Sequence, residues 1–402
     1  MIATGRIVFV LLQALAVLTA GPAIAGRIAD EAWPDRILIA NPSGSLEAHL
    51  RADGLVVERA ERLDALGLSL MVAKPPRGVA AADAVRQLRV EFPAAIIARD
   101  DPFRLATDAR SNVRSGRGNV SDRQRVLRSI GWQAFGASAG AGMRIGVIDS
   151  SIDPAHPALQ GARIVKRSFT SGKTPTADTA HGTAIAAMLV GQSDGTAIAG
   201  LLRGATLFHA GIFQKSKQGP MASGADFLRA VDWLVKSGAT VINASVTSET
   251  ENPVVLYAMS LLSHKDVILV AAAGNRGPDG PPAYPAAIDS AFAVTAVSLD
   301  GGAYEHANTG DYIDIAAPGI DLPTTSRRIT SGTSLAVPFV TAAVARAVRM
   351  CGVTPREAEE SLQANARDLG PSGRDSSFGW GLLRAPSCAA PQLSARHPQS
   401  TR

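Results

Sequence analysis

Residues 330–338 read Thr-Ser-Gly-Thr-Ser-Leu-Ala-Val-Pro and lead into a mostly apolar stretch that ends at Met350. Because this stretch is apolar on nearly every side, it predicts an α-helix buried inside a large domain. Gly332 allows a sharp turn into the first helical turn, where unpaired N–H groups and the helix dipole favour negative charge. A serine at such a position is most often a simple N-cap. It is also a suitable place for a nucleophile beside an oxyanion site, so Ser334 is a candidate catalytic residue.

A second apolar run, Ile145-Gly146-Val147-Ile148, ends in Asp149. A short apolar run of this kind predicts a buried strand of a parallel sheet. Open parallel sheets bind ligands at the carboxyl ends of their strands, which makes Asp149 a candidate functional acid. The alternative for Asp149 is a solvated loop aspartate, and the nearby Asp153 is a candidate for that role.

His181 stands at the start of a third informative segment, His181-Gly182-Thr183, which opens a run of small and apolar residues that ends at Gly191. This run predicts another buried helix, with His181 at its beginning. The other six histidines lack such a context, and we expect surface or packing roles for them: His49, His156, His209, His264, His306 and His397.

A serine hydroxyl is a poor nucleophile at neutral pH and needs a base, which in turn needs an orienting group. Asp149, His181 and Ser334 supply these three types in the order Asp, His, Ser. With these motifs the chain resembles the subtilisin-like serine proteases, or subtilases. The resemblance implies a three-layer α/β catalytic domain with a mostly parallel sheet. It also implies a serine endopeptidase that hydrolyses peptides or proteins through an acyl-enzyme.

The resemblance assigns further site residues. Asn275 follows an apolar, strand-like run and would donate to the oxyanion, with Gly274 beside it at the substrate. Asn243, Ala244 and Ser245 resemble the strand whose edge pairs with an extended peptide. Val246 and Thr247 then replace the small residues common in relatives, so the sequence leaves the preference for the residue before the cleaved bond open.

Residues 1–25 have the features of a secretory signal peptide: Arg6, a short apolar core and small residues before Gly26. The apolar core is too short for a typical membrane span, although an uncleaved anchor is the alternative. No later stretch approaches that length by inspection, so we expect a protein exported to the periplasm or the outside, without a stable membrane anchor.

Residues 26–105 alternate strand-like and helix-like segments in the order β-α-β-β-α-β, which predicts a small α+β domain of the ferredoxin-like type. In position it resembles subtilase pro-domains, which assist folding and then block the active-site cleft with their C-terminal tail. The chain would then be made as a zymogen with its own pro-domain as inhibitor. A persistent substrate-recruiting domain is the alternative. The expected segments span 36–40, 45–53, 54–63, 67–73, 80–92 and 94–99.

Residues 106–130 are predicted to be an arginine-rich, exposed linker and processing region, since seven arginines lie between Arg104 and Arg128. The net charge of +5 owes much to this segment, and no interleaved aromatic residues indicate a nucleic-acid partner. Residues 131–390 would form the catalytic domain and residues 391–402 a flexible tail.

Cys351 and Cys388 are the only cysteines, and in an exported protein such a pair is a candidate disulfide; two free thiols are the alternative. No cofactor or metal is expected. Calcium is possible in principle, but the loop from Gln192 to Ala199, where several relatives bind it, offers only Asp194. Two other functions stay open: an inactive subtilase that serves as a binding or chaperone protein, and an exported esterase.

Overall fold

The computed structural model describes residue 33 and residues 35–106, 114–115, 120–133, 140–170, 176–192, 197–325 and 328–388. The chain divides into two units, Met1–Trp33 and Pro34–Arg402, and every element described below belongs to the second. The predicted signal peptide (1–25) and the predicted tail (391–402) lie outside the described residues.

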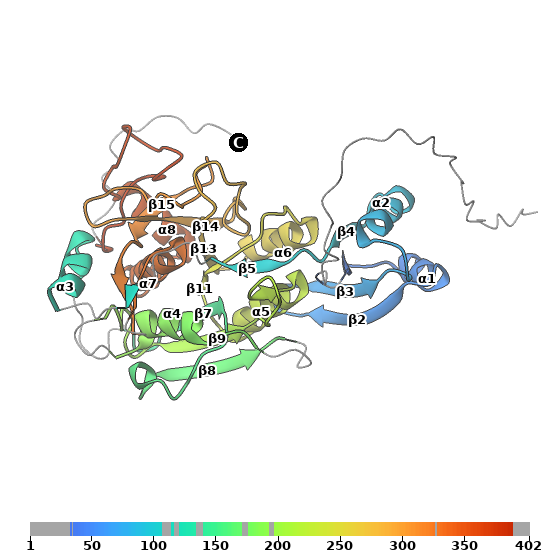
Figure 1. Ribbon diagram of the computed structural model, residues 1–402, viewed down its shortest axis with the longest axis horizontal. Coiled ribbons are helices and arrows are strands. Elements are labelled where there is room, and N and C mark those ends of the chain that lie inside the picture. Colours follow the sequence, from blue (N-terminus) through green and yellow to red (C-terminus); the bar gives the residue numbers. More distant parts are fainter. Residues whose placement is uncertain are drawn as a thin grey trace, which may run out of the picture. The chain divides into compact units, whose positions relative to one another are not determined.

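The first sheet, near the N-terminus, has four antiparallel strands in the order β2-β3-β1-β4 (Figure 1). Two helices connect the strands and give the predicted order β-α-β-β-α-β. The ferredoxin-like prediction is confirmed, with element ends within two residues of the expected ones. The elements are β1 (Ile37–Ala40), α1 (Gly44–Ala52), β2 (Val56–Leu63), β3 (Leu68–Lys74), α2 (Ala81–Glu91) and β4 (Ile96–Arg99).

The two faces of this small sheet have different neighbours. Residues of alternating positions, such as Ile37 and Ile39, pack under α1 and α2 in a core of their own. The opposite face, including Leu38, belongs to a cluster that also contains residues of two helices further along the chain, such as Phe227 and Val254. Because strand side chains alternate between faces, one half of this sheet is buried only against the rest of the protein.

The large sheet has seven strands in the order β15-β14-β13-β11-β7-β9-β8, and all neighbours are parallel (Figure 1). Helices cover both faces, as buried parallel sheets require. The fold is therefore a three-layer α/β domain, as predicted. The strands are β7 (Arg144–Asp149), β8 (Arg163–Ser168), β9 (Thr206–Gly211), β11 (Val241–Ala244), β13 (Ile268–Ala272), β14 (Ala291–Val297) and β15 (Ile315–Pro318).

One face of the large sheet packs against α4 (Ala180–Val190), α7 (Thr333–Cys351) and α8 (Pro355–Ala364). The other face packs against α5 (Gly224–Lys236) and α6 (Pro253–Ser263). A short 3-10 helix, η1, spans Pro157–Leu159.

Two small three-stranded sheets flank the large one. The first has the order β10-β5-β12, with β5 (Phe103–Leu105) between β10 (Met221–Ala222) and β12 (Val246–Thr247). The second has the order β16-β17-β6 and is formed by β16 (Leu322–Pro323), β17 (Arg328–Thr330) and β6 (Arg114–Ser115). In both sheets, strands from the predicted pro-domain and linker pair with strands of the catalytic domain.

The prediction of an exposed linker over residues 106–130 is wrong in its second half. Residues Val120–Ser129 form helix α3, in which Val126 and Leu127 are buried. Trp132 is buried just beyond, under the guanidinium of Arg346, which lies 4.3 Å from its ring centroid. The arginines make α3 polar overall, but its two buried residues join Ile130 and Trp132 in the core beside the large sheet.

Helix α7 is long and apolar enough to cross a membrane, contrary to our expectation that no later stretch approaches that length. However, 78% of its apolar window is buried by other parts of the chain, as in the core helix of a soluble protein. Pro338 lies inside the helix, and Gly352 ends it in the left-handed conformation with φ 67°.

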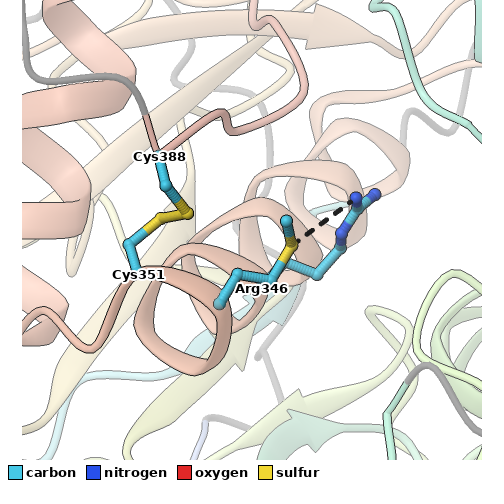
Figure 2. The surroundings of a disulfide bond; sticks show 4 residues. Arg346, Cys351 and Cys388 are labelled. Atoms are coloured by element: carbon cyan, nitrogen blue, oxygen red, sulfur yellow. Dashed lines mark hydrogen bonds between the residues drawn. A yellow bond between two sulfur atoms is a disulfide. The ribbon is translucent and has the colours of Figure 1, made fainter.

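The predicted disulfide is present and joins the C-terminal end of α7 to the segment that follows residues 379–381. Cys351 and Cys388 have a Cα–Cα distance of 5.3 Å, and Figure 2 shows the bond beside the last turn of the helix. One turn earlier, Arg346 lies 3.9 Å from the sulfur of Met350 (Figure 2). The bond ties the last described segment to the core.

Candidate active site

Three chain segments place the predicted catalytic residues. Asp149 is the last residue of β7, near the middle of the large sheet, and is fully buried. His181 is the second residue of α4, and Ser334 is the second residue of α7. The strand end and both helix starts lie at the edge where parallel sheets bind ligands.

Asp149 and His181 are directly hydrogen-bonded. The distance from Nδ1 of His181 to Oδ1 of Asp149 is 2.7 Å, and the same oxygen accepts the Ser150 N–H at 2.6 Å. This contact requires Gly182, because a Cβ there would collide with the backbone carbonyl of Ser150. Thr183 adds a second tie by accepting the Asp153 N–H at 2.9 Å. The motif His-Gly-Thr thus docks α4 onto the end of β7.

Because Nδ1 of His181 is bonded to Asp149, the other ring nitrogen, Nε2, points away from Asp149. Among the described residues this atom has no hydrogen-bond partner, so the Ser334 hydroxyl is not bonded to it in this state. Catalytic hydrogen bonds are often longer before the reacting complex forms. Ser334 itself is 2% exposed, and its backbone oxygen accepts a hydrogen bond from the Ser245 hydroxyl at 3.1 Å.

A second histidine lies near the carboxylate. His209 of β9 faces the same side of the sheet as Val147, with which it is in register. Burial lowers the pKa of His209 to about 4, although the charge of Asp149 raises it. It is therefore neutral near pH 7 and does not act as a second cationic partner for Asp149. The expectation of a surface or packing role for His209 agrees with its burial.

Asn275 is held in a single orientation. Its Oδ1 accepts hydrogen bonds from both the backbone N–H and the hydroxyl of Thr333, each at 3.0 Å. These two donors direct Nδ2 toward the cleft, where it donates to the backbone oxygen of Ala106 at 2.6 Å. A Cβ at Gly332, where φ is 155°, would lie 3.4 Å from Nδ2, 3.4 Å from Ser334 Oγ and 3.6 Å from this oxygen. The amide, the hydroxyl and the carbonyl thus surround one point.

The sequence did not point to Thr333 or Ala106. Thr333 directly precedes the candidate nucleophile, and a hydroxyl at that position is a local signal that could have been used. Ala106 lies 228 positions before Ser334 in the chain, and nothing in the local sequence marks it.

Residues 103–106 are extended and pair with other segments of the chain on both sides. On one side Leu105 and Arg104 are in antiparallel register with Val246 and Thr247. On the other side, Arg104 is in register with Met221. The Ala106 N–H donates to the backbone oxygen of Ser245 at 3.0 Å. Residues 103–106 therefore lie as an extended segment between residues 221–222 and residues 245–247.

The peptide-binding edge differs in part from the prediction. Ser245 does contact the bound segment, but Asn243 and Ala244 belong to the large sheet and are fully buried. The Asn243 side chain bonds Ser245 Oγ at 3.0 Å and Thr341 Oγ1 at 3.2 Å. Their assignment to the binding edge is wrong by two residues, because the edge begins where the chain leaves β11.

Phe103 and Ala106 of this segment have different surroundings. Phe103 is 2% exposed and stacks on Phe227 of α5, with ring centroids 4.6 Å apart. A cavity of about 800 Å³ lies beside Ala106. Its polar lining includes Thr247, Glu249, Gly274, Arg276, His306 and Asn308. Gly274 lines this cavity, with φ 104° and no room for a Cβ beside Asn308.

The described residues contain one group able to hold a metal ion, His49 with Asp53 and Glu91. All three belong to the small N-terminal domain, where Nε2 of His49 lies 2.6 Å from Glu91 and 3.2 Å from Asp53. Residues 193–196 of the loop considered for calcium lie outside the described residues. The expectation that this loop holds no clear calcium site stays a prediction.

Aspartate, histidine and serine at the carboxyl edge of a parallel sheet, next to a fixed amide donor, are the residue types, in the chain order, of one class of hydrolases with a serine nucleophile. Comparison with known proteins defines the family. The chain belongs to the subtilase family, whose model matches residues 140–381.

Individual relatives agree with this assignment. Minor extracellular protease Epr of Bacillus subtilis is 29% identical over 276 residues, which cover 67% of this chain and 42% of Epr. Subtilisin DY of Bacillus licheniformis is 26% identical over 259 residues, 62% of this chain and 92% of that protein. The chain thus spans less than half the length of Epr.

The fold is also similar to a solved structure. Fervidolysin from Fervidobacterium pennivorans, described as a keratinolytic enzyme related to subtilisin, superposes with a TM-score of 0.72 at 20% identity. The match covers 90% of this chain and 61% of fervidolysin. Residues 140–402 make up less than 90% of this chain, so the part that superposes on fervidolysin includes residues before 140.

Proposed function

We propose that this chain is the precursor of a serine endopeptidase and that the first bond it cuts is its own Ala106–Thr107 bond. One observation carries the proposal. The oxygen of Ala106 accepts a 2.6 Å hydrogen bond from Asn275, at the place where the oxyanion of a tetrahedral intermediate would be held. The strand pairing of residues 103–105 holds the same peptide in an extended form.

The proposed reaction begins with attack of Ser334 Oγ on the carbonyl carbon of Ala106. His181 takes the hydroxyl proton at Nε2, while Asp149 holds the opposite N–H and stabilises the imidazolium that forms. Asn275 and the backbone N–H of Ser334 would stabilise the oxyanion. Collapse breaks the C–N bond, and His181 returns the proton to the leaving amine. Water then hydrolyses the ester, and no cofactor is consumed.

Cleavage would leave the N-terminal domain as an inhibitor. The new carboxyl group of Ala106 stays in the groove, because strand β5 keeps its partners on both sides. The buried carboxyl of Asp100 adds a contact by accepting the first N–H of α5, from Gly224, at 2.7 Å. The enzyme would become active when this domain leaves or is digested.

The substrates proposed for the mature enzyme are peptides and proteins in extended form. The stacking of Phe103 on Phe227 favours an aromatic residue four positions before the cleaved bond. The cavity beside Ala106 leaves room for side chains larger than a methyl group at the position directly before that bond. An esterase would need an apolar acyl channel, whereas this groove offers backbone pairing and polar walls.

Export to the periplasm or the outside forms part of the proposal. It is supported by the composition of residues 1–25 and by the extracellular relatives, of which Epr is one. The test is the N-terminus of the secreted precursor, which would begin at Gly26. A precursor that keeps Met1 and stays in the membrane fraction would contradict it.

The cleavage itself is tested with the precursor lacking residues 1–25. We expect it to convert into two fragments, one ending at Ala106 and one beginning at Thr107, as measured by intact mass over time. The Ser334→Ala form should stay whole, and Ser376→Ala, which changes an exposed serine, should convert at the normal rate. Equal conversion of all three forms, or a cut at another bond, would contradict the proposal.

A further inference from the structure

Four charged side chains form a closed ring where β2 of the N-terminal domain meets α5. Arg59 lies 3.7 Å from Asp226, and Glu61 lies 3.2 Å from Arg229, so two ion pairs of the ring cross between the domains. Outside the ring, Lys236 at the end of α5 lies 3.6 Å from the more exposed Asp64. Asp226 and Arg229 are 3.1 Å apart within α5, and Arg59 and Glu61 are 3.9 Å apart within β2. Each charge therefore has two neighbours of opposite sign.

The local structure of each element sets this alternation. Arg59 and Glu61 are two residues apart on β2 and point to the same face of the sheet. Asp226 and Arg229 are three residues apart on α5 and lie on one face of the helix. If β2 were shifted along α5 so that Arg59 faced Arg229, two like charges would be adjacent. The ring thus permits one register of the two domains.

The half of the ring on α5 is also held by contacts that do not involve the N-terminal domain. Arg229 donates to the backbone oxygen of Phe169 at 3.3 Å and lies 5.5 Å from that ring's centroid. The side chains of Asp226 and Arg229 are 17% and 20% exposed in the docked state, and those of Arg59 and Glu61 are 38% and 30% exposed. The four side chains are buried enough that salt does not fully screen their attraction. They are also exposed enough that added salt weakens it.

We propose that this ring is the recognition element by which the catalytic domain selects and retains its own N-terminal domain after the Ala106–Thr107 bond is cut. The partner that fits this face of α5 is a sheet edge carrying Arg-x-Glu in the register of β2. The inference rests on the proposed function, because it requires the cut domain to stay bound.

Affinity and selectivity would then have separate sources. The apolar face that includes Leu38 and Leu70 shares a core with α5 and α6, and such burial is favourable but not directional. Alternating charges contribute less net affinity, because their desolvation offsets the attraction. They penalise a wrong partner strongly, since like charges would be placed at close range.

The test exchanges charges without changing their number. One variant carries Arg59→Glu with Glu61→Arg, a second carries Asp226→Arg with Arg229→Glu, and a third carries all four changes. In each two-site variant the pair inside its own domain is kept, but both contacts between the domains become repulsive. The four-site variant restores every opposite-sign neighbour.

The measured quantity is the rate at which the fragment ending at Ala106 leaves the cut enzyme. It is followed by size separation and by the onset of hydrolysis of an added peptide. We expect release to be about tenfold faster in each two-site variant and to return to within about threefold of the unmodified rate in the four-site variant. In the unmodified protein, raising NaCl from about 0.05 M to about 0.5 M should also speed release.

Unchanged release in the two-site variants, or no recovery in the four-site variant, would overturn the proposal. If a variant does not fold, as judged by its melting curve, salt dependence of release from the unmodified protein decides: no dependence would overturn it. Intact mass separates this result from the proposed function. Absence of the fragment ending at Ala106 in the unmodified protein refutes the cleavage, whereas normal cleavage with charge-independent release refutes the ring alone.

Discussion

Replacing Asn275 by alanine gives the most direct test of the proposed oxyanion site. The change removes the Nδ2 donor that lies 2.6 Å from the oxygen of Ala106. In the bound peptide this oxygen is a neutral carbonyl, and a hydrogen bond to it contributes about 1 kcal/mol. In the transition state the oxygen carries negative charge, and the same bond contributes about 2–3 kcal/mol.

The difference between the two states sets the expected kinetics. A loss of about 2–3 kcal/mol in the transition state corresponds to a roughly 30- to 150-fold lower kcat/KM, at about 1.36 kcal/mol for each factor of ten. The weaker loss in the ground state limits the rise in KM to about fivefold. Most of the effect should therefore appear in kcat.

Thr333→Val is the matched control. It removes one of the two donors that orient Asn275 Oδ1 and keeps the other, the backbone N–H. We expect a loss of about 2- to 10-fold, because the amide stays in place with one restraint fewer. The assay is steady-state hydrolysis of a peptide with an aromatic residue four positions before the cleaved bond, beside the conversion rate of each precursor. The reasoning is refuted if Asn275→Ala raises KM with kcat unchanged, or if Thr333→Val is the more damaging change.

Three other predictions follow from contacts in the structure. Asp149→Asn should lower kcat on the order of 10⁴-fold at pH 7, because the amide favours the wrong imidazole tautomer; a loss below tenfold would contradict this. Replacing Cys351 and Cys388 together by serine should lower the free energy of unfolding by about 3–4 kcal/mol in a denaturant titration, and an unchanged midpoint would be the contrary result. Burial raises the pKa of Asp100 to about 6, against the opposing effects of Arg36 and the Gly224 N–H. The docked domain therefore binds a proton that the freed domain has lost, so docking should weaken as pH rises from about 4 to about 6. Asp100→Asn should remove that slope from the pH dependence of fragment release, and an unaltered slope would show that another group titrates.

Much of the architecture could be predicted from local patterns. The six elements of the small N-terminal domain were predicted because alternation at period two and apolar spacing at period 3.6 are visible in short windows. Asp149, His181 and Ser334 were predicted for a similar reason, since Asp149 ends an apolar run, His181 and Ser334 each begin one, and their small neighbours are local in sequence. The disulfide was predicted because the sequence contains only two cysteines.

Other features depended on contacts that no local window contains. Helix α3 was missed because its buried positions are diluted by arginines and become apolar partners only against the catalytic domain. Asn243 was placed at the peptide-binding edge, although it lies two residues inside the sheet, because the sequence does not show where β11 ends and the edge begins.

The sequence by itself determined the kind of chemistry available to this protein, because residue types and their spacing along strands and helix starts are local properties. Only the tertiary structure decided which peptide lies in the active site. The oxygen of Ala106 meets the amide of Asn275, 169 residues later in the chain, once the small domain has docked on α5 and α6. Such a contact has no signature in either segment, since it arises from packing and charge pairing between whole surfaces.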